Sequence, residues 1–253
     1  MQIFRRLSDS ISSYEFTLIS HRGGKGFGPE NTLESLSNAL DYGVEMIETD
    51  VRMSKDGVPI IHHSPFLGIQ LLSHLNLEEI MQKAPKIPTL KDYLDLAGKR
   101  CALNLEIKKC QPHILAELIK RASLNYPILV SSFDSDFLKE FGKLECPAEC
   151  GLVTQYNPIT ERLLEEAIQC GATTLLSVSY SISENFVNAA HKVGLRLFAW
   201  TVNTTVQLQN MIQAGVDGVV TDSYKELKEW MLSQMPFGAG AETAVLDDGS
   251  LPL

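Results

Sequence analysis

Residues 38–51, NALDYGVEMIETDV, decide the fold, because they run from a helix-like segment through a glycine into a short apolar and β-branched strand. Glycine is the residue best able to take the left-handed conformation that closes a helix before the chain turns into a strand. The same unit recurs as YLDLAGKRCALNLEI (93–107), EEAIQCGATTLLSVS (165–179), NAAHKVGLRLFAWTV (188–202) and MIQAGVDGVVTD (211–222). A unit that repeats in this way predicts alternating strands and helices.

Working outward from these units gives eight strand candidates, at residues 17–20, 46–51, 101–107, 128–132, 150–154, 174–178, 196–202 and 218–221. Amphipathic segments with helical spacing lie between them, such as 160–169 and 184–192. Eight βα units in 253 residues match the size of a TIM (β/α)8 barrel, and we expect residues 1–235 to form one such domain. A doubly wound open sheet is the competing architecture. Residues 236–253 have no periodicity and are expected to form a flexible C-terminal tail.

The composition excludes several classes of protein. With 44% hydrophobic and 21% charged residues, the chain has enough apolar material for one large core, which excludes a mainly disordered protein. The 22 Lys and Arg against 31 Asp and Glu give a net charge of −9, which offers no general field for nucleic acid. The chain contains no run of about 18 apolar residues, so we expect no stable membrane insertion. The first segment, MQIFRRLSDSISSYEF, lacks the apolar core of a secretory signal, so we expect a cytoplasmic protein.

The end of the first strand carries the first candidate residues, since reactive groups in such a barrel sit at the carboxyl ends of strands. The strand leads into His21 and Arg22 and then into the glycine-rich loop GGKGFG at 23–28. The Arg22 guanidinium is a planar fork suited to phosphate, and the His21 imidazole exchanges protons near neutral pH. The alternative is that His21 only closes the strand and Arg22 pairs with an acidic neighbour.

The second strand carries two carboxylates on one face. Glu48 and Asp50 are two residues apart, so their side chains point the same way, with Arg52 next in the row. Inside a barrel the two carboxylates would repel each other and lose hydration, so they need protons or a cation to stay there. A hard divalent ion such as Mg²⁺ or Ca²⁺ would resolve the conflict. The alternative is that the row faces solvent or pairs with Arg52.

Two further segments complete the set. Adjacent residues on a strand face opposite ways, so at most one of His62 and His63 points into the site. Glu106 and Lys108 share a strand face, where Glu106 could join the metal shell and Lys108 could neutralise an anion. A plain ion pair between these two strand neighbours is the alternative. Together the residues fit metal-assisted hydrolysis of a phosphate ester, in which the ion polarises a phosphoryl oxygen and histidines move protons.

At these residues the sequence resembles the glycerophosphodiester phosphodiesterase family. The family pattern of His-Arg-Gly, a short loop and Pro-Glu-Asn-Thr appears at residues 21–23 and 29–32. Further matches are Glu48 and Asp50 followed by SKDGVPII (54–61), Glu106-Ile107-Lys108, IPTLKDYL (87–94), SSFD (131–134), WTVN (200–203) and GVDGVVTD (215–222). The resemblance extends from about residue 17 to residue 222.

The resemblance implies a TIM barrel that uses one divalent cation, Mg²⁺ or Ca²⁺, and small-molecule substrates. Its members hydrolyse glycerophosphodiesters, such as glycerophosphocholine or glycerophosphoethanolamine, to an alcohol and sn-glycerol 3-phosphate. The residues that it assigns are His21 and His63 as the acid–base pair, Glu48, Asp50 and Glu106 as metal ligands, and Arg22 and Lys108 as phosphate-binding residues. His63 is preferred over His62 because counting from Asp56-Gly57 places His63 at the histidine of the family's His-Asp pair.

The sequence departs from the family pattern in two places. The His-Asp pair reads His63-Ser64, and the Arg-Thr-Thr stretch expected after Leu67 is absent. We therefore expect a reduced insertion over the barrel mouth and a more open site. Apolar Phe66, Leu67, Ile69 and Leu71 nearby would then allow a lysophospholipid as substrate, which makes a lysophospholipase D an alternative function. The other interpretation is that these residues only pack the shortened loop.

Trp200 and Asp222 lie at the ends of the last two predicted strands, and the sequence allows two roles for each. The aromatic face of Trp200 could bind glycerol or a choline-like head group, although a core tryptophan would look the same in sequence. For Asp222 we expect capping of a helix that begins at Ser223 rather than a contact with the site. A catalytically impaired phosphate-binding barrel is the non-enzymatic alternative. A nucleotide-binding fold lacks support, because no Gly-x-Gly-x-x-Gly or Walker loop follows the first strand.

Overall fold

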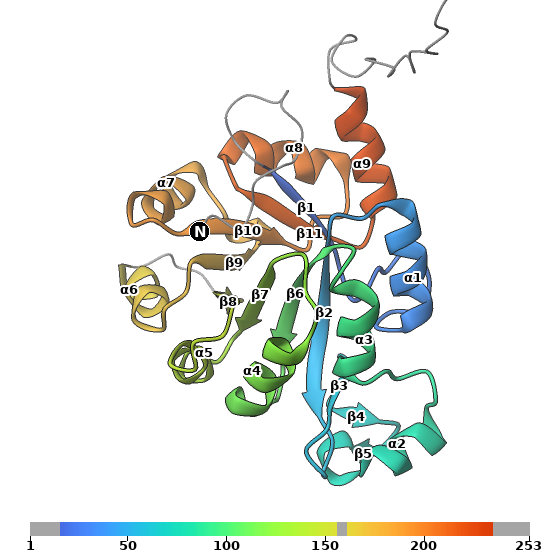
Figure 1. The fold of residues 1–253 in the computed structure, drawn as a ribbon. Helices are drawn as coiled ribbons and strands as arrows, with labels where there is room; N and C mark the ends of the chain where they lie inside the picture. Colours follow the sequence, from blue (N-terminus) through green and yellow to red (C-terminus); the bar gives the residue numbers. More distant parts are fainter. Residues whose placement is uncertain (1–15, 156–160, 235–253) are drawn as a thin grey trace, which may run out of the picture.

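Parallel strands and helices alternate along the chain in the computed structural model, which describes residues 16–155 and 161–234 (Figure 1). The parallel strands of this part of the chain are β1 (Thr17–Ser20), β2 (Met46–Met53), β6 (Ala102–Ile107), β7 (Ile128–Ser132), β8 (Glu149–Thr154), β9 (Thr174–Val178), β10 (Arg196–Trp200) and β11 (Gly218–Thr221). The predicted strands thus all form, with bounds that agree within two residues.

The sheet closes on itself. Its order is β1-β11-β10-β9-β8-β7-β6-β2, and β1 also pairs with β2, so Ile19 lies opposite Met46 and Ser20 opposite Ile47. A doubly wound sheet has two open edges, whereas here each of the parallel strands has a parallel neighbour on both sides. The predicted TIM barrel is confirmed, and the open sheet is excluded.

A helix follows each parallel strand in the described residues. These helices are α1 (Leu33–Tyr42), α3 (Leu90–Ala97), α4 (Pro112–Arg121), α5 (Ser135–Gly142), α6 (Glu161–Gln169), α7 (Glu184–Lys192), α8 (Thr205–Ala214) and α9 (Tyr224–Ser233). Side-chain caps start several of them: Thr32 accepts from the Ser35 amide, and Thr204 forms a capping box with Gln207. The predicted helical segment 160–169 begins at Thr160, which lies outside the described residues, and so does the predicted C-terminal tail at 236–253.

The glycines predicted to end helices take the left-handed conformation, with one exception. Gly43 and Gly215 end α1 and α8 with φ of 87° and 84°, a conformation that favours glycine. Gly98 ends α3 with φ of −63° and so does not need glycine's left-handed freedom. A Cβ at that position would lie 2.4 Å from Leu124 Cδ2, so a larger residue there would require the Leu124 side chain to move.

Two apolar cores lie on either side of the barrel wall. The larger one fills the space between strands and helices, and includes Leu36, Tyr93, Leu103 and Phe186. The smaller one fills the barrel interior with one residue from each parallel strand: Ile19, Met46, Ala102, Leu129, Val153, Leu176, Phe198 and Val220. We call this set the apolar layer. It plugs the barrel and forms the floor on which the candidate site rests.

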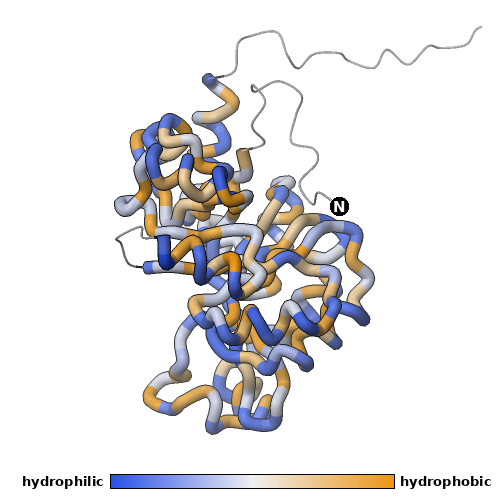
Figure 2. Tube along the Cα trace, turned by 90° about the vertical axis from the view of Figure 1, so that its left-hand side faces the viewer, coloured by the Kyte–Doolittle hydropathy of each residue, from blue (hydrophilic) through white to orange (hydrophobic). Residues whose placement is uncertain are grey.

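A small insertion separates β2 from α3. Strand β3 (Pro59–Ile61) pairs antiparallel with β2 and is followed by β4 (Phe66–Leu67), β5 (Gln70–Leu71), the short helix η1 (Leu72–His74) and α2 (Leu77–Lys83). It lies below the barrel at the carboxyl end of β2 in Figure 1, and the tube in Figure 2 shows the same separate lower part from the side. Its own core consists of Ile60, Leu72, Leu75, Ile80 and Ile87.

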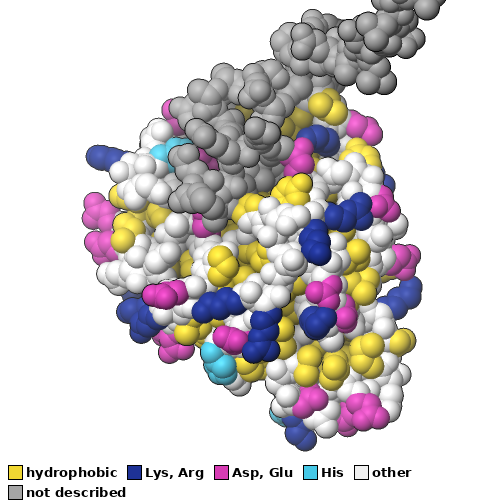
Figure 3. All heavy atoms as spheres, viewed as in Figure 1, with side chains coloured by type: hydrophobic (Ala, Val, Ile, Leu, Met, Phe, Trp, Pro, Cys, Tyr) yellow, Lys and Arg dark blue, Asp and Glu magenta, His cyan; other side chains and the backbone are white. Residues whose placement is uncertain are grey.

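Not all apolar residues of the insertion are buried. Phe66 and Leu71 are exposed, and Ile69 at the hairpin tip has 97% of its surface accessible. Figure 3 shows apolar side chains gathered on the face of this insertion. The interpretation that all these residues pack the shortened loop is therefore wrong for Ile69. No helix of the described residues is long and apolar enough to cross a bilayer.

Candidate active site

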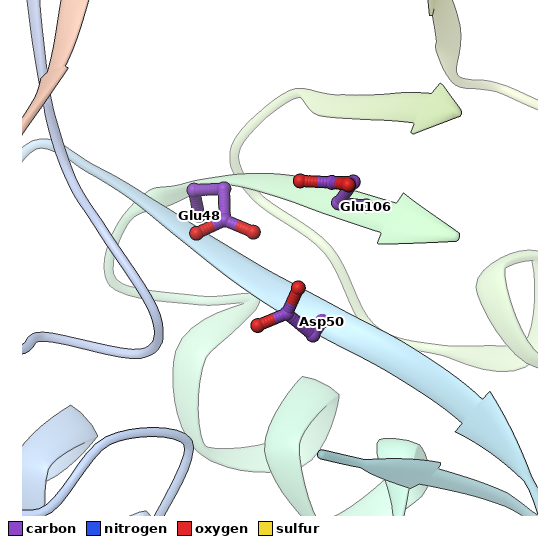
Figure 4. A group of neighbouring side chains, drawn as sticks. All are labelled: Glu48, Asp50 and Glu106. Carbon is purple, nitrogen blue, oxygen red and sulfur yellow. The ribbon is translucent and has the colours of Figure 1, made fainter. Parts of the chain in front are cut away.

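Three carboxylates from neighbouring strands converge inside the barrel mouth. Glu48 and Asp50 lie on β2 and Glu106 on β6, with Asp50 directly opposite Glu106 in the register (Figure 4). One oxygen from each carboxylate lies within 4.8 Å of the others. Glu48 and Asp50 are only 2% and 1% exposed, which excludes the alternative that this row faces solvent. Period-two alternation along β2 and the parallel register with β6 bring the three groups together.

The electrostatics of this carboxylate cluster call for a cation. Burial raises the pKa of Glu48 well above its usual range, and the neighbouring Asp50 and Glu106 raise it further. Burial also raises the pKa of Glu106, although Lys108 opposes the shift. Glu48 Oε1 is buried and has no hydrogen-bond partner among the described residues. An all-oxygen donor set with an unpartnered buried carboxylate oxygen fits a hard divalent ion such as Mg²⁺ or Ca²⁺.

Lys108 lies beside the cluster. Its ammonium donates to Glu106 Oε1 and lies 3.3 Å from Asp50 Oδ1. Burial alone would lower the pKa of Lys108, but Glu106 and Asp50 outweigh it and raise the pKa, which keeps the ammonium charged. The ion pair foreseen as the alternative thus exists. The same ammonium also brings a fixed positive charge to the barrel mouth, which a phosphate could share.

His21 lies between the cluster and Asp222, which follows β11. Its Nδ1 lies 2.6 Å from Asp222 Oδ1, and its Nε2 lies 3.7 Å from Glu48 Oε2. The expectation that Asp222 caps the next helix is wrong, because its carboxylate bonds His21 and Lys25 instead. Helix α9 begins after Ser223 with no side-chain cap. The physical reason is the β1–β11 register, which pairs Ser20 with Thr221 and so brings the next residues together.

Arg22 contributes its backbone as well as its side chain. It has φ of 50°, uncommon for a residue with a Cβ, and its amide donates to Glu48 Oε2 over 2.8 Å. Its guanidinium donates to both carboxylate oxygens of Glu30, at 3.1 and 3.3 Å. The pairing with an acidic neighbour is therefore observed. Since the Glu30 partner is exposed, a phosphate could compete for the same guanidinium.

Asn31 is a site residue to which the sequence analysis gave no role. It is buried with φ of 58°, its Nδ2 donates to Asp50 Oδ2 over 2.9 Å, and its Oδ1 accepts from Thr49. It therefore orients one of the three carboxylates. The Pro-Glu-Asn-Thr pattern at residues 29–32 contains this asparagine and is the signal in the sequence that points to it.

The two adjacent histidines have different surroundings. Burial lowers the pKa of His63, Asp50 opposes this shift, and Arg22 and Lys108 lower the pKa further. His62 instead lies with Nε2 3.4 Å from the Phe66 carbonyl, at the start of the hairpin. Ser64 Oγ accepts from the Phe66 amide, so Ser64 forms the local turn that an aspartate at this position could form as well.

Two aromatic residues pack against each other at the carboxyl ends of β7 and β10. The ring of Trp200 meets Phe133 edge to face, with centroids 6.0 Å apart, and its indole N–H donates to the Leu176 carbonyl. The Lys108 ammonium lies 5.6 Å from the centroid of Phe133. Trp200 packs against the apolar layer but is not fully buried, so part of its surface remains available to a ligand.

Comparison with protein families agrees with this geometry. The model of the "Glycerophosphoryl diester phosphodiesterase family" matches residues 21–226. A glycerophosphodiester phosphodiesterase of Caldanaerobacter subterraneus subsp. tengcongensis is 30% identical over 233 residues, covering 83% of this chain and 95% of the relative. A glycerophosphodiester phosphodiesterase of Bacillus altitudinis is 28% identical and covers 81% of this chain and 94% of its own.

Solved structures show the same fold. An Oleispira antarctica phosphodiesterase, determined in complex with the product sn-glycerol 3-phosphate, has a TM-score of 0.76 and 25% identity, and the match covers 85% of this chain and 96% of the other. A glycerophosphodiester phosphodiesterase from Thermotoga maritima has a TM-score of 0.72 and 25% identity, with 85% and 98% covered. Both similarities extend over nearly all of the described barrel.

Proposed function

The chain belongs to the glycerophosphoryl diester phosphodiesterase family, and we propose that it hydrolyses glycerophosphodiesters to an alcohol and sn-glycerol 3-phosphate. The observation that carries this proposal is the carboxylate cluster of Glu48, Asp50 and Glu106, with Lys108 and the Nε2 of His21 at its edge. A phosphodiester that enters this mouth meets positive charge, a place for a cation and groups that transfer protons.

The proposed reaction adds one water molecule across the ester bond to the alcohol. The bond between phosphorus and the alcohol oxygen breaks, phosphorus gains the water oxygen, and the alcohol leaves with a proton. His21 and His63 form the pair that takes a proton from the attacking oxygen and gives one to the leaving oxygen. In this pair His21 takes the proton from the attacking oxygen, and His63, whose lowered pKa makes its protonated form a stronger acid, gives one to the leaving oxygen.

The remaining residues hold the substrate in this proposal. Arg22 and Lys108 bind the non-bridging phosphate oxygens, and Trp200 packs against the glycerol or the alcohol. A divalent cation held by Glu48, Asp50 and Glu106 would polarise a phosphoryl oxygen. Asn31 keeps Asp50 in position for that purpose, since its amide donates to the Asp50 carboxylate.

The test is release of sn-glycerol 3-phosphate from glycerophosphocholine and glycerophosphoethanolamine by the purified protein, with Mg²⁺, with Ca²⁺ and with excess chelator. We expect release that the chelator stops. His63→Ala should lower kcat by at least about 10²-fold, whereas the matched control His62→Ala should keep most of the activity. Equal losses in both variants would contradict the assignment of His63. Binding of sn-glycerol 3-phosphate without turnover under any condition would favour a phosphate-binding barrel instead.

A second candidate substrate follows from the hairpin after His63. Exposed Phe66, Ile69 and Leu71 surround the turn of β4 and β5, close in sequence to the proposed catalytic histidine. An acyl chain attached to the glycerol would find apolar surface there, which would make the enzyme a lysophospholipase D. The same assay with lysophosphatidylcholine distinguishes the two, because Ile69→Ser should slow hydrolysis of the lysophospholipid and spare glycerophosphocholine.

A further inference from the structure

The carboxylate of Asp222 is held from several sides. Its Oδ1 accepts from His21 Nδ1 over 2.6 Å, and its Oδ2 accepts from the Lys25 ammonium over 3.0 Å. The Asn203 amide nitrogen lies 3.4 Å from the same Oδ2, and Asn203 Oδ1 accepts from the Asp222 backbone N–H over 2.9 Å. Each oxygen of the carboxylate therefore has its own donors, which fixes the plane of the group.

The charge state of Asp222 fixes the proton on the histidine. The hydrogen bond from His21, and then that from Lys25, hold the pKa of Asp222 far below its usual range. An ionised carboxylate can only accept hydrogen bonds, so the His21 nitrogen that faces it must carry the hydrogen. The other nitrogen, Nε2, faces the carboxylate cluster, and in the neutral imidazole it is the nitrogen that carries the lone pair.

The glycine-rich loop is fastened to the same point. The Lys25 amide donates to the His21 carbonyl over 2.9 Å, while the Lys25 side chain reaches Asp222. Gly26, with φ of 95°, passes so close that a Cβ there would lie 2.9 Å from the Asp222 carbonyl oxygen. The loop, the first strand and the last strand thus meet around this carboxylate.

We propose that Asp222, oriented by Lys25 and Asn203, is a positioning residue that fixes the ring of His21 with Nε2 directed at the substrate phosphate. This inference rests on the proposed function of His21 as a proton-transferring group. It gives the basic residue of the glycine-rich loop a task in the reaction without a contact to the substrate. A surface ion pair without this task would leave the rate constant unchanged when it is removed.

Asp222→Asn tests the proposal. Lys25 and Asn203 both donate to the Oδ2 position, so the new amide must place its oxygen there and turn its NH₂ toward His21. Nδ1 then has to accept, and the hydrogen moves to Nε2. We expect kcat for glycerophosphocholine to fall by about 10²- to 10⁴-fold, as it does when the histidine of a serine protease triad is held in the wrong tautomer. KM should change by less than about threefold, because substrate binding is not touched.

Lys25→Met is the second variant and tests the role given to Lys25. On its own it should lower kcat by only about three- to tenfold, since the carboxylate stays in place. In Asp222→Asn it should raise kcat above that of the single variant, because the amide is then free to turn its oxygen toward His21. A double variant that is slower than Asp222→Asn alone would overturn the role given to Lys25.

Two further readouts separate positioning from a structural role and from failure of the proposed function. Long-range ¹H–¹⁵N spectra of histidine-labelled protein, saturated with Mg²⁺ or Ca²⁺, should show hydrogen on His21 Nδ1 in the wild type and on Nε2 in Asp222→Asn. Thermal unfolding should show both variants folded. If the wild type cleaves no glycerophosphodiester, the proposed function fails, and the spectra still test the geometry. Wild-type kcat in Asp222→Asn, or an unchanged tautomer, would overturn the inference.

Discussion

Two consecutive layers of the barrel interior are built by the same strands and have opposite chemistry. The apolar layer takes Ile19, Met46 and Val220 from three of these strands. Two residues further along lie Glu48, still on its strand, and His21 and Asp222, which directly follow theirs, and we call this level the polar layer. A step of two residues keeps the side chains on the same face, so the change from core to site occurs within a single period.

This contrast teaches how a barrel separates stability from chemistry. The apolar layer contributes burial, while the polar layer opposes it, since burial raises the pKa of Glu48 and disfavours its charged form. The polar layer is tolerated because the sheet is closed and the floor beneath it is packed. If the two layers are as separate as their composition indicates, a substitution in one should leave the property supplied by the other unchanged.

The largest effect should come from a neutral substitution in the polar layer. Glu48→Gln should lower kcat/KM by at least about 10³-fold, equivalent to about 4 kcal/mol, because it removes a charge from the carboxylate cluster. Its melting temperature in chelator should not fall, since a buried carboxylate with a raised pKa is replaced by a neutral amide. Kinetics with thermal unfolding check both parts. Glu34→Gln, at an exposed ion pair, is the control, and a clear loss of stability in Glu48→Gln would break the comparison.

A cavity in the apolar layer should lower stability and leave activity nearly unchanged. Leu129→Ala removes a buried side chain two residues before Ser131 and should lower the free energy of unfolding by about 2–5 kcal/mol. Below its melting temperature the variant should keep kcat within a few-fold, because no group of the polar layer is changed. Urea unfolding and steady-state kinetics at low temperature measure the two quantities. A loss of activity as large as that of Glu48→Gln would show that the layers are mechanically coupled.

The pH dependence of stability should sharpen the contrast. The raised pKa of Glu48 means that the folded chain binds more protons than the unfolded chain, so without cation the free energy of unfolding contributed by Glu48 falls as the pH rises above the usual carboxyl range. At a fixed concentration equal to 100 times its Kd at pH 8, Mg²⁺ or Ca²⁺ should restore about 3 kcal/mol at pH 8 and less at pH 5, because the ligands must be deprotonated to bind it. Thermal unfolding across this range, with Glu48→Gln as control, checks the sign. A cation effect that does not depend on pH would contradict it.

The smallest effect should come from the insertion, which belongs to neither layer. Ile69→Ser should change the free energy of unfolding by less than about 0.5 kcal/mol, since the side chain is 97% exposed. Hydrolysis of glycerophosphocholine should also stay unchanged. Leu72→Ala, in the small core of the insertion, is the contrasting variant and should destabilise the protein measurably. A large loss of stability in Ile69→Ser would mean that the hairpin tip packs against other residues in solution.

The sequence alone predicted the barrel and the placing of the carboxylates because both depend on short periods. Helix ends at glycine and alternation along β2 are local, so Glu48 and Asp50 could be assigned to one face before any contact was known. The roles of Asp222 and Asn31 depend instead on pairings between segments far apart in the sequence. A helix cap is the usual local role for an aspartate before a serine, and only the β1–β11 register overrides it.

The pairing of β1 with β11 also has a consequence for the order in which the enzyme matures during synthesis. His21 and Asp222 are 201 positions apart, so a ribosome that adds about 5–20 residues per second needs about 10–40 s to supply the second partner after the first. Until then the barrel has an open edge and His21 Nδ1 lacks its carboxylate partner. Unfinished chains therefore already contain the residues of the carboxylate cluster, His21 and His63. They lack the Asp222 contact that orients His21, so activity should arise only when β11 closes the barrel.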